Sequence, residues 1–405
     1  MRRRLTGLGT ALLLALAARP AAAQWRLRGD VLAGVAPPVG LVVLEADGRA
    51  SSWLTAEAVV WTGATRADAS VDSDALGVRV GGGDGVGNDD IVGDVQVITL
   101  HMRAPSGRAE ARVGRFIAAI GALPPLHLDG AAAVARQGRF RVEGFAGIPA
   151  VPRLGAAAFD WTAGGRVARR FGKEGALGLA YYQRRGVGRL EDEEVGVDAA
   201  WPGPVDVAAR AALDLQDPIG LSDAHLSAAA RSGPLRVEVF VTSRSPSRRL
   251  PATSLFSVLG DVPAHRAGVS ARMRAAPRLD VDLLASLRAQ DGEPGAEVAV
   301  RALLRLDDRG DGAVGLELRR DMLWTGTRAF LRAPMGRLTG SLECEAVIAD
   351  DPHGRGAVWP WALAALRAAP ARHWETALAL EASASPEYSS RMQLMASLSR
   401  RWDVP

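Results

Sequence analysis

AEVAVRALLRLDDRGDGAVGLELRR, residues 296–320, contains two runs in which apolar and charged side chains alternate, separated by the turn-rich DDRGDG. Val298, Val300 and Leu304 share one parity, and Glu297 and Arg301 share the other. A period of two places successive side chains on opposite faces of a strand. The stretch therefore predicts a β-hairpin with one apolar and one charged face. Because a lone hairpin is marginal in water, the apolar face needs a partner.

Alternating runs of the same kind recur over most of the chain. Between Val205 and Leu215 every odd position is apolar, whereas Asp206, Arg210 and Asp214 lie on even positions. Such runs return at intervals of roughly 10 to 16 residues and are about as long as strands that cross a membrane at a tilt. We therefore predict an all-β fold, a single antiparallel transmembrane β-barrel of about 16–20 strands, which occupies residues 24–405.

The composition of the apolar positions favours contact with lipid over a soluble core. They carry mostly Ala, Val and Leu, and aromatic residues make up only 5% of the chain, so few large side chains are available to fill a core. A membrane barrel turns its apolar positions outward and its polar positions toward the lumen. It must also be closed, because unpaired edge groups are costly in hydrocarbon. The same low aromatic content predicts thin aromatic girdles and keeps a soluble periplasmic or secreted β-protein open as an alternative.

The N-terminus, MRRRLTGLGTALLLALAARPAAAQ, combines a cationic start, an apolar run and small residues before Gln24. This order predicts a secretory signal peptide over residues 1–23, with Ala21 and Ala23 at the small positions before the cleavage site. A membrane anchor is the alternative. It is disfavoured because the apolar run is short for a bilayer and is followed by Arg19 and Pro20.

Charge and cysteine content exclude several classes of partner and site. The formal charge of +4 falls to zero when the four arginines of residues 1–23 are removed, so nucleic acid is not expected as a partner. Cys344 is the only cysteine, which excludes an intramolecular disulfide and a paired-cysteine metal site. No uncharged apolar run of 18 residues follows the signal, so no membrane-spanning helix is expected.

Two segments interrupt the alternation and predict long loops, near residues 63–94 and 243–264. In the first, the glycine- and aspartate-rich residues 81–90 resemble one turn of a calcium-binding repeat, but such turns act by stacking and no second copy is present. A surface loop with a short strand at most near residues 76–80 is therefore the preferred interpretation. The second segment contains prolines that a paired strand interior would exclude. Pro360, further on, leaves a short helix open as an alternative to a strand.

Residues 107–150 carry a resemblance to a known family. A Gly114-Arg115 element precedes an apolar stretch with Gly121, and the sequence HLDG at residues 127–130 leads into the run RFRVEGFAGIPA. This order resembles porin-type outer-membrane β-barrel proteins of high-GC Gram-negative bacteria, in which a strand ends in a GR element and a DG-containing segment leads to the next strand. The resemblance implies an outer-membrane location and contact with outer-membrane lipid. It assigns no functional residue.

The last run places Met392, Leu394, Ala396, Leu398 and Trp402 on one parity. An alternating final strand near an aromatic residue is what the barrel-assembly machinery reads in outer-membrane proteins, so this machinery is expected as a partner.

The charged positions predict a passive, water-filled channel for small solutes. Their mixed signs and the neutral mature charge imply no strong ion preference. Two alternatives remain open, a structural or partner-binding barrel without an open pore, and a soluble secreted or periplasmic β-protein. The residues expected to line the pore are Asp206, Arg210, Asp214, Asp280, Asp282, Glu297, Arg301, Arg305, Glu317 and Arg319.

No sequence pattern indicates catalysis, a metal or a cofactor. The six histidines, at positions 101, 127, 225, 265, 353 and 373, lack ligand spacing, and no GxSxG elbow occurs. We therefore predict a protein that is not an enzyme and that holds no metal or cofactor. The acidic run from Glu191 to Glu194 is interpreted as a solvated loop that could also gate or recruit a solute.

Overall fold

The computed structural model describes residues 24–35, 38–66, 89–150, 160–172, 174–216, 218–245, 264–290, 292–321, 324–350, 358–371, 373–384 and 390–404. In these ranges the chain forms 22 β-strands. They contain no helix with the length and apolar character needed to cross a membrane. The strands are β1 (Gln24–Val35), β2 (Pro38–Arg49), β3 (Leu54–Arg66), β4 (Asp89–Arg103), β5 (Ala109–Ala118), β6 (Leu126–Gln137), β7 (Phe140–Pro149), β8 (Trp161–Phe171), β9 (Gly175–Gly186), β10 (Arg189–Trp201), β11 (Val205–Asp214), β12 (Gly220–Ser232), β13 (Leu235–Arg244), β14 (Ala264–Ala276), β15 (Leu279–Gln290), β16 (Glu293–Arg305), β17 (Ala313–Arg320), β18 (Trp324–Met335), β19 (Leu338–Ala349), β20 (Val358–Ala371), β21 (Trp374–Ser383) and β22 (Arg391–Val404).

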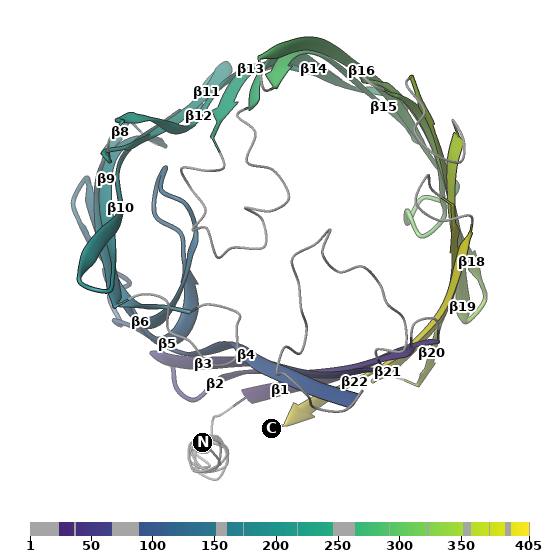
Figure 1. Ribbon diagram of the computed structural model, residues 1–405, viewed down its shortest axis with the longest axis horizontal. Coiled ribbons are helices and arrows are strands. Elements are labelled where there is room, and N and C mark those ends of the chain that lie inside the picture. The colour runs from purple at the N-terminus through teal and green to yellow at the C-terminus, as the bar shows by residue number, and fades with distance from the viewer. Residues whose placement is uncertain are drawn as a thin grey trace.

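The strands close into one antiparallel ring (Figure 1). Each strand pairs with its neighbours in the sequence, and β1 pairs with β22 from Trp25 opposite Val404 to Gly34 opposite Met395. Closure gives every strand two partners, as hydrocarbon requires. The predicted fold class, a single antiparallel β-barrel, is confirmed.

The predicted number of strands, about 16–20, is too low, because the structure has 22. The alternation underestimates strands in which both faces carry small side chains. In β6, residues 130–136 read GAAAVAR, so the two faces differ little in polarity. Pro360 is the third residue of β20 and lies opposite Ala346, so the short helix is wrong. Near a strand end the missing N–H of a proline is tolerated.

The stretch from Ala296 to Arg320 forms the predicted hairpin. In β16 and β17, Val300 lies opposite Leu318 and Arg301 lies opposite Glu317, so like residues share a face. Val298 is 50% exposed, whereas Glu297 on the other face is 3% exposed. The apolar face is thus the exposed one, as expected for a surface that contacts lipid.

The connection between β5 and β6, residues 119–125, identifies the inner face of the ring and is called the inner segment below. In Figure 1 it is the blue chain that lies inside the ring beside β6 and β10. A Cβ atom added to Gly121 would lie 2.5 Å from Oδ1 of Asp198 and 2.7 Å from Cδ of Arg166. Arg166 in β8 and Asp198 in β10 therefore point inward. The pairing register extends this inner face from strand to strand around the ring.

A row of three glycines accompanies the departure of the inner segment from the wall. Gly114 lies opposite Gly130, which lies opposite Gly147. Gly114 has a φ of 124°, and a Cβ atom there would lie 2.0 Å from the carbonyl oxygen of Ile98, so only glycine fits. Beyond Arg115, β5 no longer pairs with β4 but continues with β6.

Apolar side chains hold the inner segment against the wall. Ile120 and Leu123 are buried in one cluster that also contains residues of β5, β6, β7 and β9, namely Phe116, Ala118, Leu128, Phe145, Ala180 and Tyr182. Gly196 of β10 leaves space for the segment, because a Cβ atom there would lie 3.2 Å from that of Ala122. The cluster is a small dry core inside the ring, on one side of it.

The connections at the two ends of the barrel differ in length. Those from an even-numbered to an odd-numbered strand span at most seven residues, and residues 306–312 are the longest of them. The connections at the other end include residues 67–88, 150–160 and 245–263. We call these the short-turn end and the long-loop end.

The strands reach into both predicted loops. β3 ends at Arg66 and β4 begins at Asp89, while β13 ends at Arg244 and β14 begins at Ala264. The rest of the two loops, the short strand considered near residues 76–80 and the predicted signal peptide all lie outside the described residues.

Outward tryptophans form a sparse belt that is concentrated at the short-turn end. The direction of each strand shows at which end of the barrel its tryptophan lies. Four lie at the short-turn end, namely Trp25, Trp201, Trp374 and Trp402, and Trp161 lies at the long-loop end. The guanidinium of Arg400 lies over the rings of Trp374 and Trp402, 4.7 and 4.9 Å from their centroids. Indoles of this kind mark a membrane–water interface.

Candidate functional site

The inner face carries all ten residues that were predicted to line a pore. Those on β15, β16 and β17 form one continuous charged surface, because Asp282 lies opposite Arg301, which in turn lies opposite Glu317. The three on β11 lie four strands away from β15. Contact of a solute with these residues stays a prediction.

Glu297 lies at the centre of the surface on β15 to β17. Its carboxylate contacts Nη2 of Arg266 at 2.6 Å and Nη2 of Arg319 at 2.8 Å. Nearby, Nη2 of Arg288 contacts Asp321 at 2.7 Å. Two guanidiniums around one buried carboxylate compensate for its desolvation and hold β14, β16 and β17 together through their side chains.

Asp280 forms a second centre on the same surface, nearer the short-turn end. Its carboxylate accepts hydrogen bonds from Nη2 of Arg305 at 2.5 Å and from Nε of Arg274 at 3.4 Å. Asp282 contacts Nε of Arg272 at 3.3 Å. The sequence therefore placed these charges on the correct face, but it did not show that most of them occur in pairs.

Arg301 and Glu317 differ from the other predicted residues of this surface. Within the described part of the chain neither side chain forms an ion pair. The Arg301 guanidinium instead lies over the Phe330 ring, 5.7 Å from its centroid.

The residues on β11 have separate roles. Nε of Arg210 contacts Asp223 of β12 at 3.1 Å. Asp206 accepts a hydrogen bond from the backbone N–H of Gly203 at 3.1 Å, and Asp214 accepts one from that of Gln216 at 2.9 Å. The two aspartates therefore stabilise the turns at either end of β11 rather than forming one patch with Arg210.

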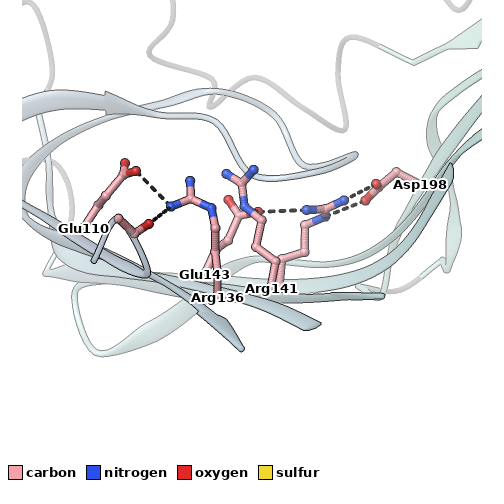
Figure 2. Close-up of polar contacts among 7 residues, drawn as sticks. Glu110, Arg136, Arg141, Glu143 and Asp198 are labelled. Atoms are coloured by element: carbon pink, nitrogen blue, oxygen red, sulfur yellow. Dashed lines mark hydrogen bonds and ion pairs between the residues drawn. The ribbon is translucent and has the colours of Figure 1, made fainter. Parts of the chain in front are cut away.

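A buried network beneath the inner segment was missed by the sequence analysis (Figure 2). Nη1 of Arg166 donates to Glu143 at 2.8 Å, and its Nε donates to Asp198 at 2.8 Å, with Nη2 on the second oxygen of Asp198. Arg141 contacts Glu143 at 2.8 Å. A separate pair joins β5 and β6, where Nη1 of Arg136 donates to a Glu110 oxygen at 2.9 Å. The network around Arg166 links β7, β8 and β10 across the inner wall.

The acidic run from Glu191 to Glu194 is part of β10, so its interpretation as a solvated loop is wrong. Asp192 is 4% exposed and Glu194 is fully buried. The hydroxyl of Tyr182 donates to Asp192, and Nη2 of Arg184 contacts the same carboxylate at 3.1 Å. Alternation along a strand sends every second acidic side chain inward, where a tyrosine and an arginine of β9 compensate for its burial.

Part of this network had a signal in the sequence. Glu143 alternates with apolar neighbours in the run RFRVEGF, and Arg166 and Asp198 also occupy the polar parity of their strands. No local pattern indicates that residues 119–125 fold back over them, because that contact joins Gly121 to Asp198 across many intervening strands.

The inner face offers ion pairs and hydrogen-bonding groups to a solute, and no reactive arrangement is formed among the residues described. These residues contain no group of three or more His, Cys, Asp or Glu side chains with the geometry to hold a metal ion. Several histidines with described side chains have local polar partners. His127, for example, lies 2.6 Å from the carbonyl oxygen of Gln96, and Nδ1 of His265 lies 2.9 Å from Oγ of Ser243.

The sequence matches no protein family and no curated protein. Among solved structures, the chain is similar to the FrpB iron transporter from Neisseria meningitidis, with a TM-score of 0.55, 7% identity and coverage of 94% of this chain and 81% of the other. The copper transporter OprC gives a TM-score of 0.54 at 8% identity, with coverage of 93% and 80%. The translocation pore of the P pilus usher PapC gives 0.51 at 10% identity, with coverage of 95% and 100%.

These three structures are described as a pore or as transporters, and at such low identity the likeness concerns the fold. It agrees with the resemblance of residues 107–150 at the level of architecture, and the paired Arg115 and Asp129 of that region contact each other at 2.6 Å. The chain has the fold of an outer-membrane β-barrel, closed by 22 antiparallel strands.

Proposed function

We propose that the protein is an outer-membrane channel through which small hydrophilic solutes diffuse passively. The observation that carries this proposal is the charged inner face of a closed ring of 22 strands. Strands spaced about 4.8 Å apart and tilted by roughly 40° give a ring about 40 Å across at this strand number. Wall side chains alone are too short to fill such a space.

The inner segment covers only one sector of the wall. Arg166 and Glu143, which lie beneath it, have side chains 11% and 8% exposed. On β14, the side chains of Arg272 and Arg274 are 66% and 60% exposed although each contacts a carboxylate. Water therefore reaches the inner face of the uncovered sector. This sector provides the path, and its paired charges give no strong preference for either sign of ion.

The asymmetry of the connections supports an orientation in the membrane. Single-chain barrels of the outer membrane have short turns on the periplasmic side and longer loops outside. The short-turn end would then face the periplasm, and the belt of Trp25, Trp201, Trp374 and Trp402 would lie at the periplasmic interface. The apolar outer face would contact outer-membrane lipid, and the signal peptide and the barrel-assembly machinery would bring the chain there. The proposal assigns no enzymatic step.

Conductance in planar lipid bilayers tests the channel. We expect discrete steps in symmetric KCl from protein that shifts in gel mobility on heating, with similar permeability for K⁺ and Cl⁻. Folded, heat-modifiable protein that gives no steps would contradict the channel and favour a structural or partner-binding barrel. Recovery of the protein from the periplasm or the medium without detergent would contradict a membrane barrel of any kind.

A further inference from the structure

A cavity of about 540 Å³ lies at the short-turn end of the inner face. It is bordered by the turn between β16 and β17, here called the β16–β17 turn (residues 306–312), and by the inner wall from β16 to β20. Its lining includes the basic side chains of Arg301, Arg305, Arg309 and Arg332 and the apolar side chains of Leu303 and Phe330. A volume of this size is in the range of small-molecule sites, which is roughly 300 to 1,000 Å³.

The residues that line the cavity carry a net positive charge, because they include four arginines and only two acidic residues, Asp308 and Glu343. Three charges at its edge are already neutralised: Arg305 contacts Asp280 at 2.5 Å, Asp308 contacts Arg278 at 2.7 Å, and Glu343 contacts Arg328. Arg301, Arg309 and Arg332 have no carboxylate within ion-pair distance in the described ranges. By contrast, Arg266, Arg272, Arg274, Arg288 and Arg319 on β14, β15 and β17 each contact a carboxylate.

The cavity is also organised before any ligand arrives. Arg332 donates from Nε to the carbonyl oxygen of Asp311 at 2.9 Å and from Nη2 to that of Gly310 at 2.6 Å. The turn that provides these carbonyls is held by Asp307, whose carboxylate accepts from the backbone N–H groups of Asp311 at 3.0 Å and Gly312 at 2.5 Å. Fixed donors lose less entropy when a ligand binds.

We infer that this cavity binds a small solute with more than one anionic oxygen group, such as a phosphate or a polycarboxylate. Planar guanidiniums pair with such groups through two parallel hydrogen bonds, and three unneutralised arginines match a multivalent anion better than chloride. Leu303 and Phe330 add an apolar wall for a short carbon skeleton. The inference rests on the proposed channel, in which the site would hold anionic solutes at one mouth.

Titration calorimetry of the detergent-solubilised barrel with pyrophosphate tests the site at constant ionic strength. The double variant Arg309→Gln/Arg332→Gln should weaken binding at least tenfold. The control Arg236→Gln/Arg272→Gln removes the same charge from adjacent inner positions at which each arginine already contacts a carboxylate, and it should change affinity less than twofold. The single variant Arg309→Gln changes only the exposed turn and keeps the test valid if the double variant does not fold. It should show part of the loss of pyrophosphate affinity.

Two results would overturn the inference: wild-type protein that binds no pyrophosphate, or equal losses in the double variant and its control. Bilayer recordings separate this failure from failure of the channel. Conducting protein that binds no pyrophosphate rejects the site and leaves the channel standing. Protein that binds pyrophosphate without conducting rejects the channel and supports a binding site in a closed barrel.

Discussion

Substitution of Gly121 by alanine tests whether the inner segment is locked to the wall. Gly121 has a φ of 56°, and a Cβ atom added there would lie 2.5 Å from Oδ1 of Asp198 and 2.8 Å from Nε of Arg166. Gly138 is a matched control, because its φ is 59° and nothing lies within 4 Å of an added Cβ atom. Both variants thus introduce the same left-handed alanine, and only one introduces a steric conflict.

The left-handed conformation costs alanine about 1 kcal/mol, and this is the whole effect expected for Gly138→Ala. In Gly121→Ala either the inner segment lifts or the Arg166–Asp198 pair separates. Breaking a buried ion pair costs about 3–5 kcal/mol. Asp198 keeps partial exposure, and both side chains can shift, so we expect about 2 kcal/mol beyond the control. The free energy of unfolding should therefore fall by about 3 kcal/mol in Gly121→Ala.

Urea unfolding in lipid vesicles, followed by tryptophan fluorescence, measures both variants. Bilayer conductance provides a second readout, since a segment that lifts from the wall moves into the lumen and narrows the path in Gly121→Ala, whereas Gly138→Ala should leave the path unchanged. If the two unfolding free energies agree to within about 0.5 kcal/mol, the usual limit of additivity for independent sites, the segment is not held by these contacts.

Three further tests address the two faces of the barrel, the Arg166–Asp198 pair and the β16–β17 turn. Val300→Lys puts a charge on the lipid face and should cost about 2–4 kcal/mol near the bilayer centre, whereas Ala299→Lys on the inner face should insert normally; equal yields of heat-modifiable protein would contradict the assignment of faces. Arg166→Met should destabilise the barrel by about 3 kcal/mol, and Arg166→Met/Asp198→Leu should destabilise it by clearly less. A double variant that is no more stable than the single variant would show that the unpaired Asp198 is not the cause of the destabilisation. Backbone N–H groups of the β16–β17 turn lower the pKa of Asp307. The stability advantage of wild type over Asp307→Asn should therefore be complete above the usual carboxyl pKa and lost as the pH falls through the lowered pKa. Urea midpoints of the two proteins that differ equally at pH 6 and at about pH 2 would refute this.

The fold followed from the sequence because the period of two is a local property. In the hairpin of residues 296–320, a few alternating residues are enough to show which face is apolar and which is charged. Most other strands of the barrel have the same alternation. The number of strands was underestimated because small side chains on both faces of a strand remove the difference in polarity between them, as in the GAAAVAR run of β6. The three inward side chains of Glu297, Asp280 and Arg319 were identified by parity alone.

The covered sector could not be predicted, because it depends on contacts between distant strands. Gly121 meets Asp198 only after β5 leaves β4 and the ring has formed. Likewise, four consecutive acidic residues favour a solvated loop when they are considered alone. Only the pairing of β9 with β10 brings Tyr182 and Arg184 to Asp192 and makes its burial tolerable.

The pairing of β1 with β22 makes the first and last strands of the barrel depend on each other. Ten residue pairs join them, from Trp25 opposite Val404 to Gly34 opposite Met395. A chain whose final strand has not yet been delivered has two open edges, and each edge carries a row of backbone groups that lipid cannot satisfy. Insertion must therefore wait for the whole polypeptide, and loss of the last strand alone should abolish the barrel rather than shorten it by one strand.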